Sequence, residues 1–302
     1  MTEGNAFEHP HAPYASPPEV GAAAASALFL GYSAPMPGLD SRYSDLMAAH
    51  ETRLLAVPAL VGAVSEAASR SVGETVLEAV SGSRAVAGYA DLRVTGYLTP
   101  LARAALLEQK LSKVLTGMSH GDIRLFARAL EMAGPRYPGK ALEEAINVAS
   151  RAGRDATLRD AMRLATGRDS MAREYARDFE VSRELARPAL FGALVRIEAT
   201  RPALVQAYLE VLAEVPDLDV ATKAGCKEAE EVSRMANGVL KSGGAYSRRG
   251  LQAISNLDGL LRADRRLVPS ATEPPVIAAA FLVALEHGSG FLNHRVRPAP
   301  SR

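Results

Sequence analysis

Charged side chains that could bind phosphate or metal gather in three polar turns of this sequence. The turns read SAPMPGLDSRYSD over residues 33–45, GRDSMAREYARDFE over 167–180, and VPDLDVATKAG over 215–225. Arginine can hold phosphate oxygens through two hydrogen bonds, and a carboxylate can hold Mg²⁺ on a polyphosphate. The same residue types also cap helices and form solvated ion pairs, so each turn has a structural interpretation as well.

In the first turn, Pro35, Pro37 and Gly38 predict a tight, ordered loop. Arg42 and Asp45 follow at its end, where they could clamp a phosphate and hold Mg²⁺. The alternative is that both residues cap helices. The pattern of this turn alone favours that alternative.

In the second turn, Asp169 or Ser170 is a suitable N-cap. From Asp169, the spacing i, i+4, i+8 places Arg173 and Arg177 on the same helical face. Glu174 and Asp178 form a neighbouring acidic row. A salt-bridged face exposed to solvent explains this pattern equally well.

In the third turn, Asp217 and Asp219 precede a helix whose first turn is expected to carry Lys223. A helix N-terminus beside a lysine favours anion binding. The alternative is that Asp219 caps the helix. The residues of this turn leave both interpretations open.

Several common classes of site have no sequence support. The chain lacks GxxxxGK[ST], GxSxG, HExxH and CxxC motifs and a strand followed by GxGxxG. Its histidines are not spaced as metal-ligand pairs. Cys226, the only cysteine, excludes an intrachain disulfide and fits a reducing, cytoplasmic compartment. We interpret it as a small helix residue rather than a nucleophile.

Composition favours a helical protein without a polyanionic partner. Thirty-five Lys and Arg balance 34 Asp and Glu, so neither nucleic acid nor an anionic membrane is expected as a partner. The apolar run over residues 20–30 is too short to span a bilayer, and we predict that it is a buried first helix. Aromatic residues make up only 5% of the chain, while Ala, Leu, Arg and Glu are abundant.

The periodicity predicts an all-α fold with one compact domain of about a dozen helices over residues 18–289. Residues 1–17 are expected to be a disordered tail, and residues 290–302 a second tail. Ser71 and Glu74 form a capping box, and residues 242–244 (SGG) a helix stop. Thr99 and Pro100 are expected to cap and open a helix. The apolar helix that follows Pro274 and Pro275 is expected to lie in the core.

Together these segments resemble the triphosphoribosyl-dephospho-CoA synthase family, and most of all its archaeal and methylotroph-type branch. The resemblance spans residues 20–288. The segments that carry it are PMPGLDSRYSD, SVGETVLEAV, RDSMAREYARDFE, AEVPDLDVATKAGCKEAEEVSRMA and VPSATEPPVIAAAFLVAL.

The resemblance implies a helical transferase that moves the triphosphoribosyl part of ATP to a dephospho-CoA hydroxyl and releases adenine. Mg²⁺ on the triphosphate is expected. By match, the catalytic carboxylates would be Asp45, Asp169 and Asp178, with Asp45 and Asp169 also as Mg²⁺ ligands. The matching substrate-binding positions are Pro37, Gly38, Arg42, Arg168, Arg173, Asp217 and Lys223.

Four segments depart from the family pattern. Met36 replaces a lysine, Pro274 replaces an aspartate, and polar loops are altered at Val94–Pro100 and Ser150–Leu158. One hypothesis is therefore an enzyme with a changed acceptor, such as a precursor of a one-carbon carrier cofactor. A second is a catalytically degenerate paralogue that partners another subunit. A third is a helical scaffold. A homo-oligomer is compatible with all three.

Overall fold

The computed structural model describes residues 14–43, 47–134, 140–153, 155–197 and 199–293, and this part of the chain contains helices and no strand. The expectation of an all-α fold is confirmed, with fifteen α-helices in place of about a dozen. The helices are α1 (Pro17–Ser33), α2 (Met47–Ser65), α3 (Val72–Ala87), α4 (Leu92–Leu106), α5 (Leu111–Thr116), α6 (His120–Ala133), α7 (Lys140–Arg151), α8 (Leu158–Ala165), α9 (Ser170–Ala176), α10 (Arg187–Arg196), α11 (Thr200–Glu214), α12 (Leu218–Lys223), α13 (Cys226–Lys241), α14 (Arg248–Ala263) and α15 (Glu273–His287). Four short segments complete them, the π-helical η1 (Val181–Ala186) and the 3₁₀ turns η2 (Gly244–Tyr246), η3 (Arg265–Leu267) and η4 (Ser289–Leu292).

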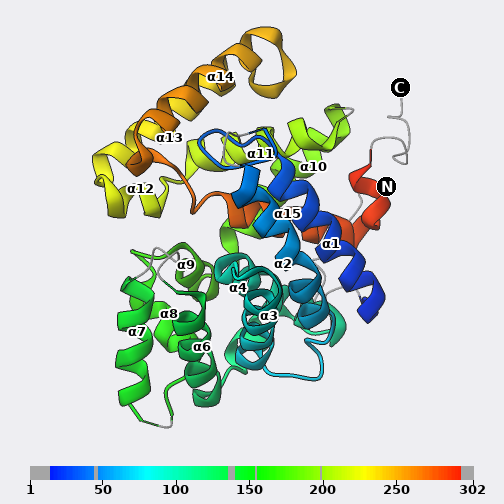
Figure 1. The fold of residues 1–302 in the computed structure, drawn as a ribbon, viewed down its shortest axis with the longest axis vertical. Coiled ribbons are helices and arrows are strands. Elements are labelled where there is room, and N and C mark those ends of the chain that lie inside the picture. The colour runs from blue at the N-terminus through cyan, green and yellow to red at the C-terminus, as the bar shows by residue number, and fades with distance from the viewer. Residues whose placement is uncertain (1–13, 44–46, 135–139, 154, 198, 294–302) are drawn as a thin grey trace.

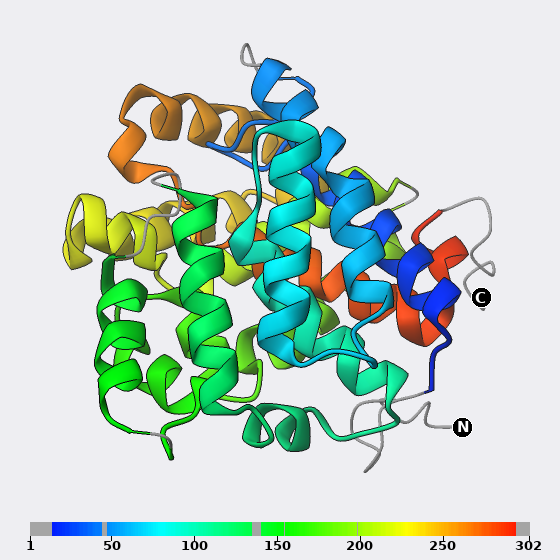
Figure 2. The same cartoon turned by 60° about the horizontal axis from the view of Figure 1, so that its bottom comes forward.

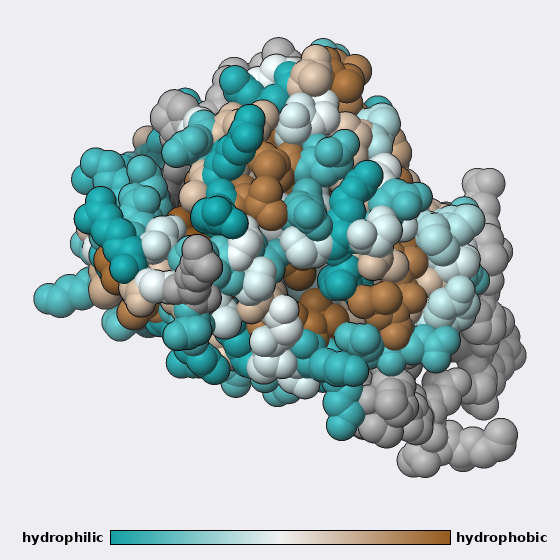
Figure 3. Space-filling view, turned by 90° about the horizontal axis from the view of Figure 1, so that it is seen from below, coloured by the Kyte–Doolittle hydropathy of each residue, from teal (hydrophilic) through white to brown (hydrophobic). Residues whose placement is uncertain are grey.

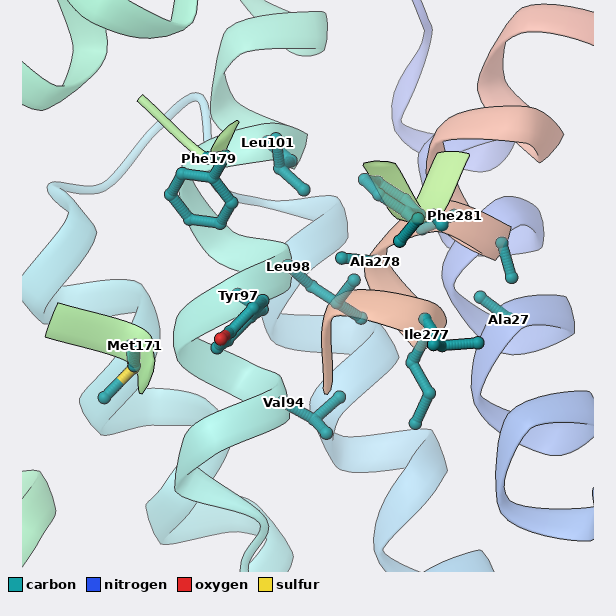
Figure 4. Close-up of a cluster of buried hydrophobic side chains, with 14 of the residues drawn as sticks. Ala27, Val94, Tyr97, Leu98, Leu101, Met171, Phe179, Ile277, Ala278 and Phe281 are labelled. Atoms are coloured by element: carbon teal, nitrogen blue, oxygen red, sulfur yellow. The ribbon is translucent and has the colours of Figure 1, made fainter. Parts of the chain in front are cut away.

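Helix α15 lies at the centre of the molecule (Figure 1). Its residues from Glu273 to Ala284 are all buried. It packs against α1, α4, α10 and η1, and Figure 4 shows its Ile277, Ala278 and Phe281 between α1 and α4. Burial of apolar side chains stabilises the folded state, so a helix that is apolar on every side is most stable when other helices surround it. The predicted core position of this helix is therefore confirmed.

Two groups of helices lie on different sides of α15, as Figures 1 and 2 show from two directions. Helices α3, α4 and α6 to α9 lie below it in the view of Figure 1, whereas α11, α13 and α14 lie above it and α12 lies to its left. Helix α4 contacts both α9 and α15, and α11 contacts both α13 and α15. The N-terminal end of α15 therefore lies where the two groups meet.

Helix α1 begins at Pro17, with a capping box between Ser16 and Glu19. The expected tail over residues 1–17 therefore overlaps the helix by one residue, Pro17. A proline at the first helical position and a glutamate three residues after the N-cap both favour a helix start here. Residues 1–13 lie outside the described part. At the other end, η4 occupies the first residues of the expected C-terminal tail, and residues 294–302 are not described.

Two of the predicted helix ends are confirmed and one is wrong. The Ser71–Glu74 capping box starts α3, and Gly243 follows the end of α13 with a φ of 105°. Thr99 and Pro100 instead lie inside α4, which Asp91 caps through a hydrogen bond from the Val94 amide. A proline inside a helix leaves the carbonyl four residues earlier without its usual donor. Here that carbonyl belongs to Gly96.

The Tyr175 hydroxyl supplies the missing hydrogen bond. It donates to the Gly96 carbonyl over 2.8 Å, and both groups are buried. Gly96 also lets Met171 pack directly against the α4 backbone, where a Cβ atom would overlap its sulfur. Helices α4 and α9 are therefore joined at the point where Pro100 interrupts the helical hydrogen bonds.

The surface is mainly polar, with small apolar groups between charged side chains in the face that Figure 3 shows. Within the described residues, no helix combines the length and the hydrophobicity needed to cross a bilayer.

We predict that Tyr175→Phe lowers the free energy of unfolding by about 1–3 kcal/mol, because the buried Gly96 carbonyl then has no donor. In a Pro100→Ala background the alanine N–H can bond to this carbonyl, so the same substitution should cost less than 1 kcal/mol, about the worth of one hydrogen bond. Urea unfolding of the four proteins of this double-mutant cycle measures the difference.

The matched control is Tyr14→Phe, since Tyr14 is 64% exposed. This substitution should leave stability unchanged. Equal costs of Tyr175→Phe in both backgrounds would show that the hydroxyl does not compensate for Pro100.

Candidate functional site

Six buried or nearly buried charged residues meet where α2, α4, α12 and α15 converge. We call them the carboxylate–arginine cluster: Arg53, Asp91, Arg93, Asp217, Asp219 and Glu273. Asp91 and Asp217 cap α4 and α12, and Glu273 is the first residue of α15. Three helix N-termini therefore bring carboxylates to one place. Arg93 in the first turn of α4 and Arg53 in α2 supply the opposite charge.

Arg93 and Asp219 form a two-pronged ion pair across the middle of the cluster. The two guanidinium nitrogens donate to the two carboxylate oxygens over 2.7 and 2.9 Å. The Ser270 hydroxyl donates to Asp219 over 2.5 Å, and Arg93 also donates to the Ser270 carbonyl over 3.3 Å. Burial alone would raise the pKa of Asp219, but the Arg93 charge and these hydrogen bonds hold it below its usual value.

The pKa of Asp217 is shifted in the opposite direction. One carboxylate oxygen accepts from the Asp219 and Val220 amides over 2.9 and 3.1 Å, and the other accepts from the Thr272 hydroxyl over 2.7 Å. Burial and the nearby Asp219 charge raise the pKa of Asp217 to about 6. Two neighbouring carboxylates thus prefer different protonation states, which is an arrangement found in acid–base catalysis.

The interpretation of this turn from sequence needs two corrections. Asp217, not Asp219, caps α12, because Asp219 is held by Arg93. Lys223 lies in the last turn of this six-residue helix, not in the first. The Asp219 and Val220 amides at the start of α12 already bond to the Asp217 carboxylate. The anion-binding role of Lys223 stays a prediction.

Arg53 links the other half of the cluster. It donates to Glu273 over 2.7 Å and lies 3.4 Å from Asp91. Its guanidinium stacks on the Tyr32 ring at 3.8 Å, and the Tyr32 hydroxyl donates to Asp91 over 3.1 Å. Burial raises the pKa of Glu273, although the Arg53 charge opposes this shift. Every buried charge here thus has an opposite charge or a hydrogen-bond donor, as burial requires.

A side cavity of about 920 Å³ opens next to the cluster, between α6, α7, α12 and the start of α13. Lys223 and Arg168 lie in its wall, as does Cys226. The Lys223 ammonium lies 3.4 Å from the Ser270 hydroxyl, so this lysine connects the cavity to the cluster. Arg168 is exposed and pairs with Glu144 over 3.1 Å.

Helix α9 holds two predicted site residues beside α4. Asp169 is buried and caps the helix by accepting from the Ala172 amide over 2.9 Å, which confirms it as one of the two predicted caps. Arg173 is half-buried. Within the described part it has no ion-pair partner, and its Nε is buried without a hydrogen bond. Its charge acts on Tyr97 and Glu174. An arginine without a partner is a candidate phosphate contact.

The predicted acidic row of α9 does not form. Glu174 is buried and accepts from the Val181 and Ser182 amides, each over 3.1 Å, so it holds the start of η1. Burial raises its pKa. Asp178 lies beyond the end of α9 with a φ of 52°, and it pairs with Arg159 over 2.7 Å. The helix ends at Ala176, so the 3.6-residue period no longer applies at Asp178.

The first polar turn is held by distant side chains. The Pro37 carbonyl accepts from the Tyr208 hydroxyl over 3.1 Å, and the Gly38 amide donates to Asp258 over 2.7 Å. Gly38 has a φ of 82°, which favours glycine. Arg42 is exposed and lies over the Tyr43 ring, 5.3 Å from its centre. Asp45 lies outside the described residues, so its predicted role remains a prediction.

The donor set for a metal is incomplete in the described part of the chain. No three His, Cys, Asp or Glu side chains there are arranged to hold a metal ion. Asp169 and Asp178, two of the predicted carboxylates, face different partners, the Ala172 amide and Arg159. The described residues thus do not form a complete protein-borne Mg²⁺ site.

Sequence reasoning missed four of the six cluster residues: Arg53, Asp91, Arg93 and Glu273. A usable signal was present, since Arg53 and Arg93 are charged residues within predominantly apolar helical segments. Such an arginine is normally buried only with a carboxylate partner. Their partners lie far away in the chain, however, and the sequence alone does not identify them.

Comparison with known proteins gives two findings. The family model for ATP:dephospho-CoA triphosphoribosyl transferase matches residues 17–291. The fold matches the crystal structure of a protein from Archaeoglobus fulgidus assigned as a candidate triphosphoribosyl-dephospho-CoA synthase. The TM-score is 0.57 at 23% sequence identity, over 78% of this chain and 98% of that one. No curated protein sequence matches this chain significantly.

The structural match supports the fold, and the family match covers every helix and all six residues of the carboxylate–arginine cluster. The resemblance noted from the polar turns is confirmed. The chain belongs to the ATP:dephospho-CoA triphosphoribosyl transferase family.

Proposed function

We propose that the protein transfers the triphosphoribosyl group of ATP to a hydroxyl of dephospho-CoA and releases adenine. The observation that carries this proposal is the family match over residues 17–291, which includes the whole carboxylate–arginine cluster. The cluster adds what such a reaction needs, namely carboxylates with different proton affinities and, beside them, Lys223 with no ion-pair partner among the described residues. The alternative of a changed one-carbon acceptor stays a hypothesis from the sequence.

Lys223 and Arg173 are the proposed phosphate contacts. Neither has a carboxylate within ion-pair distance in the described part of the chain, so each can neutralise a ligand charge without first breaking an ion pair. Arg168 pairs with Glu144 at an exposed position, and that pair costs little to separate. Mg²⁺ would enter on the ATP triphosphate and neutralise part of its charge, with most of its remaining ligands from phosphate and water.

Asp217 is the proposed proton acceptor for the attacking hydroxyl. Its pKa of about 6 is close to the range in which a general base works best at neutral pH. The Thr272 hydroxyl bonded to it could pass the proton on, since a hydroxyl both donates and accepts. Asp219 stays ionised beside Arg93 and stabilises positive charge that develops on the ribose.

The direct test incubates the purified protein with ATP, Mg²⁺ and dephospho-CoA and measures adenine by chromatography. Adenine should form only when all three are present. Under the proposed roles, Lys223→Ala should lower kcat/KM about 10- to 100-fold, which corresponds to one charge-assisted hydrogen bond of about 1.5–3 kcal/mol.

The matched control is Lys227→Ala, which removes an exposed lysine of α13 that does not line the side cavity. Its activity should equal that of the wild type. Equal losses in both variants would remove Lys223 from the site. Absence of adenine when ATP, Mg²⁺ and dephospho-CoA are all present would refute the proposed transfer.

We predict a distinct pH dependence for Asp217→Asn. Because its pKa is raised to about 6 from the ordinary aspartate value of 3.8, the folded protein binds more protons than the unfolded chain between about pH 4 and 6. The free energy of unfolding should therefore fall as pH rises through this window, by about 3 kcal/mol at most. Asparagine cannot titrate, so this contribution should disappear in the variant.

Urea unfolding at intervals between pH 4 and 7 measures the slope, with the exposed Asp155→Asn as control. The control should keep the wild-type slope. An Asp217→Asn curve parallel to that of the wild type would mean that Asp217 is ionised throughout this range. If Asp217 accepts the proton, the activity of the variant should also fall by about 100-fold or more.

A further inference from the structure

We propose that the side cavity binds the uncharged, amide-bearing chain of the acceptor, the pantetheine class of ligand. This inference rests on the proposed function, since it assigns one of its two substrates to a place. It starts from the cavity's size of about 920 Å³ and from its position beside Lys223. A cavity of this size can bury most of a drug-sized ligand.

The charges of the cavity wall argue against polyphosphate in its body. Three carboxylates, Glu131, Glu143 and Glu144, line its body against two cations, Lys140 and Arg168, and Glu144 already pairs with Arg168 over 3.1 Å. Anionic phosphates placed among these carboxylates would be repelled. Lys223 lies at the end of the cavity next to Ser270, and no carboxylate of the described residues lies within ion-pair distance of it. The wall thus suits a ligand with a neutral body and an anionic end at Lys223.

The apolar part of the wall distinguishes a flexible chain from an adenine ring. It is formed by Leu130, Ile146 and Leu218, with Ala127 and Ala221. No aromatic side chain of the described residues lines the cavity, so these residues offer a base no ring on which to stack. Branched aliphatic side chains pack instead against methyl and methylene groups. The Asn147 side chain in the same wall offers both a donor and an acceptor to an amide.

The position of Lys223 gives the orientation. Its ammonium lies 3.4 Å from the Ser270 hydroxyl, which in turn donates to Asp219 over 2.5 Å. A phosphate at the end of the neutral chain and held by Lys223 would therefore lie beside the carboxylate–arginine cluster. In dephospho-CoA the ribose hydroxyl lies on the far side of the phosphates from the pantetheine chain. The chain in the cavity would thus direct that hydroxyl toward the cluster.

The single cysteine allows a binding test that needs no turnover. Cys226 is exposed and lines the cavity. Its alkylation by iodoacetamide, followed by intact mass, should slow at least threefold with N-ethylpantothenamide, a thiol-free analogue of the chain. MgATP alone should leave the rate unchanged. Protection by MgATP but not by the analogue would overturn the proposal and assign the cavity to the nucleotide.

A matched pair of variants on α7 tests the same proposal by kinetics. Asn147→Trp fills the cavity from an exposed position, whereas Val148→Trp adds the same ring at a 58% exposed position that does not line it. Asn147→Trp should abolish the protection by the analogue and raise the KM for dephospho-CoA at least tenfold, with the KM for ATP within twofold. Val148→Trp should change neither.

The two proposals fail separately. Protection of Cys226 without any adenine release would refute the proposed transfer and keep the pantetheine site. Adenine release with unchanged dephospho-CoA kinetics in Asn147→Trp would keep the transfer and refute this site.

Discussion

The ion pair between Arg93 and Asp219 is the contact on which the rest of the site depends. It joins the first turn of α4 to α12, and through Ser270 it also holds the segment that leads into α15. Burying two charges is costly, and only a two-pronged geometry with additional hydrogen bonds offsets the cost. The pair therefore fixes the distance between α4 and α12 closely, since either charge without the other would be uncompensated.

The same constraint explains how the segment from Ser270 to Glu273, which has no regular secondary structure over most of its length, is held in place. Their side chains meet Asp219, Asp217 and Arg53 in turn, at distances of 2.5 to 2.7 Å. Each contact satisfies a buried charge or acceptor, so a shift of this segment would leave several groups unsatisfied at once. Asp217 receives no cation of its own in this arrangement. Burial therefore raises the pKa of Asp217, whereas the Arg93 charge outweighs the effect of burial on Asp219 and lowers its pKa.

Local signals in the sequence predicted much of the fold and little of the site. The capping box at Ser71, the cap at Asp169 and the central position of α15 depend on residues that are near in the chain, and all three are confirmed. The Arg93–Asp219 pair joins residues 126 positions apart, and Arg53 and Glu273 are 220 apart. Helical periodicity carries no information on such pairings. The predicted helix start at Thr99 and Pro100 is wrong for a related reason. The helix continues through Pro100, and the donor that replaces the lost hydrogen bond is Tyr175 on another helix.

The location of the altered segments changes how they bear on catalysis. Every residue from Val94 to Pro100 is buried within α4, and Met36 is also buried. The polar contribution of α4 to the cluster comes from Asp91 and Arg93, which lie just before that segment. The altered segment Val94–Pro100 therefore removes no charged residue from the carboxylate–arginine cluster. Two other altered positions bear more directly on the chemistry: Met36 places a buried thioether beside Pro37 and Gly38, where it cannot neutralise a phosphate, and Pro274 follows Glu273 of the cluster without a carboxylate of its own.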